Sequence, residues 1–327
     1  MRSCRLLVAL VLGLTVVLPT ATAIAVTDCV FDIAPSTMTM TLTADCTTDG
    51  TIGVPYGYTL DGAGYTITAV DPVGDHFRGA VIANDGATAS VVNVRVTASG
   101  LANACDGGDD RLRGIMFDGA SGVIAHNVVS GINQGASGCQ EGNAIEVRNA
   151  PFDGTHPNTV SVAISHNEIL DYQKTGIVAN GDVDVTINHN RLGASATQAN
   201  LAANGIQVGF GASGVVSLNR VAGNQWMGTS DFAATAVLIF DAGDGLLVER
   251  NDIVGNSDIG LYVSADNGTY SKNHLVDEGV DHPNSGYDIG LGNWGSDNTV
   301  VKNHVRGFDI PFDGVDDGGK NKVLPAG

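Results

Sequence analysis

Apolar and polar positions recur along this chain in a fixed short pattern. In seven segments an apolar residue is followed, after two variable positions, by Asn and then, after one more position, by a second apolar residue. The asparagines are Asn127, Asn167, Asn190, Asn219, Asn251, Asn273 and Asn303, at spacings of 40, 23, 29, 32, 22 and 30 residues. The two shortest spacings define a repeating unit, and the longer ones are that unit with inserted residues.

A short alternating strand, usually led by Gly, precedes each Asn by roughly a dozen residues, as at 114–117, 176–179, 205–208 and 260–263. Each unit is therefore expected to hold three short strands with apolar residues at period two and no helix. Because one such unit cannot bury its apolar face alone, the units must stack. The sequence predicts an all-β, single-domain parallel β-helix of about ten coils over residues 59–323, with an N-terminal cap and first coil at 26–58 and a tail at 324–327.

The repeated asparagines are interpreted as structural. Each is placed at a tight turn that needs the left-handed backbone region, which Asn tolerates. Stacked side-chain amides can also hydrogen-bond from coil to coil and so satisfy buried polar groups. His126, His166 and His189 precede Asn in three consecutive coils, so their rings should stack near 5 Å apart. They form either a metal site or an exposed polar stripe, which Arg250, Lys272 and Lys302 continue.

These repeats resemble those of the right-handed parallel β-helix proteins of the pectin-lyase-like superfamily. The stretch TLDGAGYTI at 59–67 is similar to the opening coil of many members, and the resemblance covers residues 50 to 323. It implies a right-handed coil with the active-site cleft on the outer face of the Gly-led strands. The motifs of polygalacturonases and pectate lyases are absent. The run NAIEVR at 143–148 is loosely similar to the Asn-Gly-x-Glu-x-x-Arg motif of alginate and chondroitin lyases, with its Arg one position early and its Gly missing.

The N-terminus and the charge indicate where the protein acts. Arg2 and Arg5, an apolar run over 6–18 and two Ala-x-Ala sites predict a cleaved signal peptide at 1–25, and therefore a secreted protein. Without that segment the chain has 14 basic and 35 acidic residues, a net charge of −21. Such a surface repels nucleic acid and anionic lipid, so we expect no nucleic-acid or membrane partner. We expect a monomer whose partner is an extracellular polysaccharide.

Four cysteines remain after removal of the signal peptide: Cys29, Cys46, Cys105 and Cys139. An even number in an exported chain indicates two disulfides, although four cysteines allow three pairings. The nearest-neighbour pairing, Cys29–Cys46 and Cys105–Cys139, is the simplest. Both Cys105 and Cys139 fall in inserted loops on one edge of the predicted coil, so stacking should bring them together.

The candidate catalytic residues follow from the same stacking. Asp118, Glu146 and Arg148 point outward on successive Gly-led strands, and Lys174 enters from the loop before the next one. Strand spacing places these four within about 10 Å of one another. The structural alternative is a surface salt-bridge network, which is common on strands. Tyr172, Gln207, Trp226 and Tyr262 are the candidate substrate-binding residues, because they lie in or beside the same face.

Two reactions compete for this cluster. In β-elimination on a uronic acid, Lys174 or Arg148 would abstract a proton while a cation neutralises the substrate carboxylate. Calcium is the candidate cofactor, held by Asp106, Asp109 and Asp110 or by Asp118 and Glu146. In glycoside hydrolysis, Asp118 and Glu146 would act as an inverting pair roughly 8 Å apart. The alternative to an enzyme is a non-catalytic structural or adhesive β-helix that binds a glycan.

Overall fold

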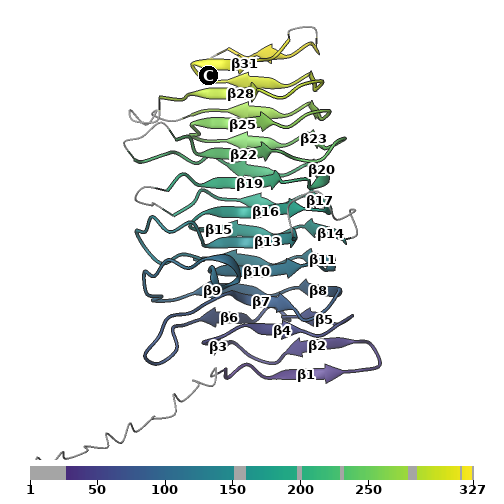
Figure 1. Cartoon of the computed structure of the whole chain (residues 1–327), viewed down its shortest axis with the longest axis vertical. Coiled ribbons are helices and arrows are strands. Elements are labelled where there is room, and N and C mark those ends of the chain that lie inside the picture. Colours follow the sequence, from purple (N-terminus) through teal and green to yellow (C-terminus); the bar gives the residue numbers. More distant parts are fainter. Residues whose placement is uncertain are drawn as a thin grey trace, which may run out of the picture.

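The computed structural model describes residues 27–150, 160–196, 201–228, 232–278, 286–316 and 319–325. These residues wind into a stack of coils, each made of three short strands, that rises from the N-terminal to the C-terminal end (Figure 1). The strands form three sheets of 11, 11 and 10 strands. The prediction of an all-β, right-handed parallel β-helix is confirmed. Within the described ranges there is no α-helix, and no helix is long and apolar enough to cross a membrane.

Each coil contributes one strand to each sheet. The first sheet holds β1 (Phe31–Ala34), β2 (Thr39–Leu42), β5 (Thr59–Asp61), β8 (Thr88–Val92), β11 (Ser121–Ala125), β14 (Val160–Ser165), β17 (Val183–Asn188), β20 (Ser213–Ser217), β23 (Leu247–Glu249), β26 (Thr269–Ser271) and β29 (Thr299–Val301). The second sheet holds β3 (Cys46–Thr48), β6 (Thr66–Ala69), β9 (Arg95–Ala98), β12 (Val128–Ser130), β15 (Glu168–Leu170), β18 (Arg191–Leu192), β21 (Arg220–Ala222), β24 (Asp252–Val254), β27 (His274–Val276), β30 (His304–Arg306) and β32 (Lys322–Val323).

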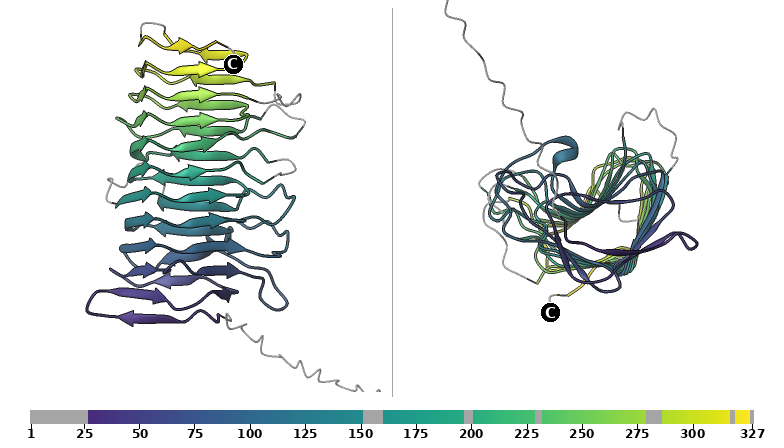
Figure 2. Two further views of the ribbon diagram at one scale, coloured as in Figure 1. Left: turned by 180° about the vertical axis from the view of Figure 1, so that it is seen from behind. Right: turned by 90° about the horizontal axis from the view of Figure 1, so that it is seen from below.

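The third sheet contains the Gly-led strands. It holds β4 (Ile52–Val54), β7 (Ala80–Asn84), β10 (Arg113–Asp118), β13 (Asn143–Asn149), β16 (Thr175–Gly181), β19 (Asn204–Gly209), β22 (Thr235–Phe240), β25 (Ile259–Ser264), β28 (Ile289–Asn293) and β31 (Ile310–Asp313). Seen along the axis, the coils superpose, and the short 3₁₀ helix η1 (Gly108–Asp110) lies outside them (Figure 2). Most inserted loops connect the second sheet to the third, so they flank the outer face of the third sheet.

The asparagine column is a continuous buried ladder. The side-chain nitrogen Nδ2 of Asn167 donates to Oδ1 of Asn190 at 3.0 Å, and the backbone N–H of Asn167 donates to the same oxygen at 3.0 Å. Nδ2 of Asn167 also donates to the carbonyl of Ile124 at 2.9 Å. The same contacts link Asn127 through to Asn321. The predicted amide stacking is therefore confirmed.

The left-handed residue of these turns is not the Asn itself, which corrects our expectation. The residue before it takes the positive φ, as for His126 (59°), His166 (57°), His189 (54°) and Lys272 (56°). This residue points out of the coil, while the Asn keeps its amide inside for the ladder. The three exposed histidine rings stack with centroids 4.9 and 5.0 Å apart, as predicted. They do not form one of the clusters of metal-ligating atoms found among the described residues.

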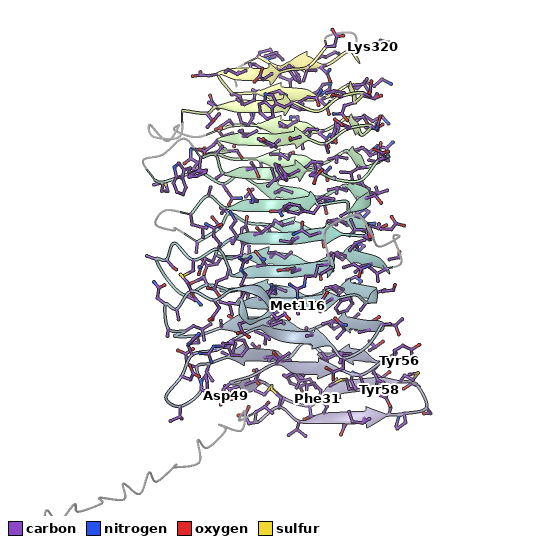
Figure 3. All side chains as sticks on the ribbon, viewed as in Figure 1. Phe31, Asp49, Tyr56, Tyr58, Met116 and Lys320 are labelled. Atoms are coloured by element: carbon purple, nitrogen blue, oxygen red, sulfur yellow. A yellow bond between two sulfur atoms is a disulfide. The ribbon has the colours of Figure 1, made fainter. Side chains whose placement is uncertain are left out.

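The N-terminal end of the stack is covered by a strand of opposite direction. β1 pairs with β2 antiparallel, with Phe31 opposite Leu42, whereas the other paired strands of the described sheets run parallel. Phe31 and Tyr58, both near this end (Figure 3), are partly buried against the core. This strand covers core that would otherwise be open to another chain. Residues 1–25, the predicted signal peptide, lie outside the described residues.

Both predicted disulfides are present. Cys29 is bonded to Cys46, with Cα atoms 4.9 Å apart, beside the N-terminal end of the stack. Cys105 is bonded to Cys139, with Cα atoms 5.1 Å apart. The second bond ties the loop that carries η1 to the loop of the next coil. Because both loops border the outer face of the third sheet, this disulfide fixes one wall of that face.

The ladder predicts a large penalty for removing one amide from its middle. Asn190→Ala would leave the backbone N–H of Asn167 and the carbonyl of Ile164 without their side-chain partner, and would remove one of the two bonds that Nδ2 of Asn167 donates. We expect the free energy of unfolding, measured by urea denaturation, to fall by about 3–4 kcal/mol, because buried unpaired polar groups cost about 1–3 kcal/mol each. Thr186→Ala, an exposed change on the neighbouring strand, should alter it by about 0.5 kcal/mol or less. Equal effects of the two changes would contradict the ladder's role.

Candidate functional site

The outer face of the third sheet holds the predicted catalytic residues. Met116, Glu146, Val178 and Gln207 are paired in register on β10, β13, β16 and β19, and Asp118, Arg148 and Asn180 form a parallel row. Met116 marks this face on β10 in Figure 3. Above these strands lies a groove of about 440 Å³, which we call the charged groove. Arg111, Asn143, Glu146, Arg148 and Lys174 line it, together with residues of β16 and β19.

Glu146 anchors the floor of the charged groove. It is buried and accepts hydrogen bonds from Nε of Arg113 at 2.6 Å and from Nδ2 of Asn143 at 2.8 Å. The guanidinium of Arg113, only 2% exposed, also donates to the carbonyls of Gly108, Asp109 and Arg111. Breaking such a buried pair from one side costs about 3–5 kcal/mol. The Arg113–Glu146 pair therefore holds η1 and its loop against the sheet.

Arg148 is held by two carboxylates. Its nitrogen Nη2 donates to Asp118 at 2.8 Å and to Asp109 at 2.5 Å. Burial acts to lower the pKa of Arg148, but the bonds to Asp118 and Asp109 outweigh it and raise that pKa above its usual range. The same contact with Arg148 lowers the pKa of Asp109. Asp118 and Glu146, the predicted hydrolase pair, are thus both engaged by arginines, which favours a role in positioning over proton transfer.

Three buried polar atoms of residues that line this groove have no hydrogen-bond partner among the described residues. They are the Nε atoms of Arg111 and Arg148 and Oδ1 of Asn143. Buried polar groups in native proteins are nearly always paired, so each exception calls for an explanation. The residues that carry these two donors and one acceptor line the same groove. This set is complementary to a ligand that carries both a carboxylate and a hydroxyl group.

Lys174 lies at the side of the charged groove, directly before β16. Its ammonium donates to the carbonyl of Ala202 at 2.5 Å. Within the described part of the chain, no carboxylate lies within ion-pair distance of it. Burial, and after it the charge of Arg111, lower the pKa of Lys174 to about 8. A lysine tuned in this way is a candidate general base near neutral pH.

Two predicted substrate-binding residues are placed elsewhere, and those predictions were wrong. Tyr172 is completely buried, and its hydroxyl bonds to Asn224 inside the coil. It lies where the chain turns from the second sheet to the third, and the turn directs its ring inward. Trp226 is 3% exposed and packs edge-on against Phe232 at 5.9 Å. Gln207 and Tyr262 do lie on the outer face, and Gln207 donates to Asn180 at 3.2 Å.

The acidic loop does not gather its carboxylates into one ligand set. Asp106 contacts Nε2 of His76 at 2.8 Å, whereas Asp109 pairs with Arg148. The clusters of three metal-ligating residues found among the described residues do not include Asp106, Asp109 and Asp110. The carboxylates of Asp106 and Asp109 turn toward different side chains, which separates them. Calcium binding here stays a prediction.

Sequence reasoning missed Arg111, Arg113 and Asn143. The period-two rule counts outward positions from the inward Ile145, and it places Asn143 on the inner face. In the structure Asn143 lines the groove and bonds to Glu146. The residue after Arg113 on β10 is Gly114, and the residue after Asn143 on β13 is Ala144. Only a glycine or an alanine therefore separates the polar residue from the inward Ile of each strand. The available signal was a row of polar residues at the first position of these strands: Arg113, Asn143, Thr175 and Asn204.

Comparison with known proteins bears on the architecture. A family model described as a right handed beta helix region matches residues 153–315. No curated protein is significantly similar to the sequence. The crystal structure of the Dettilon tailspike protein (gp208) is similar with 13% identity and a TM-score of 0.38, over 80% of this chain and 53% of that protein. The chain thus spans about half the length of that tailspike.

The lowered pKa of Lys174 can be measured directly. The chain has five lysines, and an NMR titration of their side chains should resolve one midpoint near pH 8, that of Lys174, well below the ordinary lysine value of about 10.4. Because the unfolded chain keeps its proton up to about pH 10.4, Lys174 makes the free energy of unfolding rise with pH between these values. Lys174→Arg should remove the early midpoint. A titration with no lysine midpoint near pH 8 would contradict this assignment.

Proposed function

This chain is a right-handed parallel β-helix repeat protein, and we propose that its charged groove binds an anionic, uronate-containing polysaccharide and cleaves it by β-elimination. The observation that carries the proposal is the convergence of unpaired Arg111 and Arg148 donors, the unpaired Asn143 acceptor and Lys174 of lowered pKa in one groove. Uronate residues supply a carboxylate for the two guanidinium donors and hydroxyls for the amide oxygen. The protein is acidic overall, so this groove is where an anion meets local positive charge.

The reaction assigns each side chain one task. Above pH about 8 the Lys174 amine is neutral and accepts the proton from C5 of the uronate. The C5–H electron pair forms the C4=C5 double bond, the C4–O4 bond breaks, and the departing oxygen takes a proton from water. Negative charge builds on the carboxylate as the C5 proton leaves. Arg111 and Arg148, which line the groove, would stabilise that charge through their guanidinium N–H groups.

Binding without cleavage is the second candidate function. The bond from the Lys174 ammonium to the carbonyl of Ala202 favours it, because that contact holds the amine at the wall of the groove. Binding of the uronate polymer would still depend on Arg111, Arg148 and Asn143. We also propose that the protein is exported. Two disulfides support this, because they persist in oxidising compartments.

The test is turnover of a panel of uronate polymers, followed by the ultraviolet absorbance of the unsaturated product. Lys174→Met should lower kcat/KM by about 10²–10⁴-fold, the usual contribution of a general base, while polymer binding measured by calorimetry persists. Lys272→Met is the matched control, because Lys272 lies in an exposed turn and pairs with Glu249. In the wild type kcat/KM should rise with pH to a plateau with a midpoint near about 8.

Binding with no product from any uronate polymer would contradict the lyase and leave the binding function. Product formation that Lys174→Met does not slow would show that another group is the base. No binding of any uronate polymer would overturn both candidate functions.

A further inference from the structure

A second groove lies farther along the same face, and we call it the aromatic groove. Its volume is about 480 Å³, and Phe232, Tyr262, Tyr287 and Trp294 line it over β19, β22, β25, β28 and β31. The rings of Tyr262 and Trp294 meet at 4.7 Å between centroids. Trp294 keeps 43% of its surface exposed. Large aromatic rings are thus presented to solvent at a hollow rather than packed into the core.

Gly292 is what allows the indole to lie over the sheet. A Cβ at position 292 would lie 2.1 Å from Cη2 of Trp294, so any larger residue would displace the ring. The backbone N–H of Trp294 also donates to the carbonyl of Val263 at 2.8 Å. The indole is therefore positioned by two neighbouring strands, β25 and β28. A site held by rigid strands binds with less loss of conformational freedom than one on a free loop.

The charge of the aromatic groove differs from that of the charged groove. Among the described residues that line it there is no Lys or Arg, and its one ionic side chain is Asp313. Asn204 and Thr235 add uncharged polar groups. A carboxylate brought here would meet a like charge with no cation to balance it. An uncharged sugar would stack its C–H face on the rings and bond its hydroxyls to Asp313 and Asn204.

Strand β19 borders both grooves. Asn204 lines the aromatic groove, Gln207 lines the charged groove, and Nδ2 of Asn204 contacts Oε1 of Gln207 at 3.4 Å. Four strand steps separate β13, beneath the charged groove, from β25, beneath the aromatic one. At about 4.8 Å per step the separation is roughly 19 Å. This length suits an oligosaccharide lying along the stack and exceeds a single sugar.

We propose that the aromatic groove is a binding site for neutral sugar residues of the same polysaccharide, so that the ligand combines uronate and uncharged residues. This inference rests on the proposed function for the uronate part only. The neutral site is defined by its own residues. Tyr262, Trp294 and Asp313 would select against a chain made wholly of uronates, because one that fills the charged groove would extend a carboxylate toward Asp313.

The two tryptophans make the site directly observable. Trp226 is buried and Trp294 exposed, so acrylamide quenching of the fluorescence reports mainly on Trp294. A panel of neutral gluco-, manno- and galacto-oligosaccharides should contain at least one that shifts this emission and protects it from acrylamide. Calorimetry should show its affinity reduced about tenfold or more by Trp294→Ala, as for a central aromatic contact. Trp294→Phe, which keeps a ring, should bind within a few-fold of the wild type.

The controls separate this site from the charged groove. Gly292→Ala, which keeps Trp294 but displaces its ring, should weaken neutral binding, whereas Tyr65→Ala, an exposed aromatic change elsewhere, should not. Lys174→Met should leave neutral binding unchanged. Binding of no neutral oligosaccharide, or equal binding by Trp294→Ala, would overturn the inference even if uronate cleavage is found. Neutral binding that depends on Trp294, with no uronate binding or cleavage, would instead overturn the proposed function alone.

Discussion

The buried asparagine ladder is the constraint on which the rest of this structure depends. Each amide is satisfied only by the amides of the neighbouring coils and by a carbonyl of the coil before it. A residue gained or lost at that turn would leave several buried groups unpaired, so the register of all coils is fixed there. The number of residues per coil can vary elsewhere, and it varies mainly in the connections from the second sheet to the third. The loops that vary therefore border one face, and that face is the one that carries both grooves.

Fixed register also explains the electrostatics of the charged groove. Residues from successive coils are brought to one strand spacing from each other, so Asp118 must face Arg148 and Glu146 must lie between arginines. Carboxylates thus neutralise part of the positive charge, but the Nε atoms of Arg111 and Arg148 are left over. Lys174 is buried and, secondarily, feels the charge of Arg111, and both effects lower its pKa. An acidic protein can in this way present a small site for an anion.

The sequence was sufficient for the features that depend on periodicity. The Asn spacing predicts the coils, the period-two strands predict the row of Asp118, Arg148 and Asn180, and the loop positions predict the pairing of Cys105 with Cys139. The sequence was insufficient where the direction of a side chain does not follow the period-two alternation. Tyr172 and Trp226 lie in connections whose path sets the direction of the ring, and Asn143, the first residue of β13, lines the groove although period two places it inward. The aromatic groove was missed because Trp294 reaches its place through the space above Gly292.

The central claim is that a uronate carboxylate binds between Arg111 and Arg148 with its sugar ring beside Lys174. A crystal structure of the Lys174→Met variant with a mixed uronate and neutral oligosaccharide tests it most directly, because that variant should bind without cleaving. We expect a carboxylate within hydrogen-bond distance of the two Nε atoms, a hydroxyl on Oδ1 of Asn143 and a neutral residue over Trp294. An oligosaccharide bound away from the third sheet, or one whose carboxylate contacts neither arginine, would contradict it.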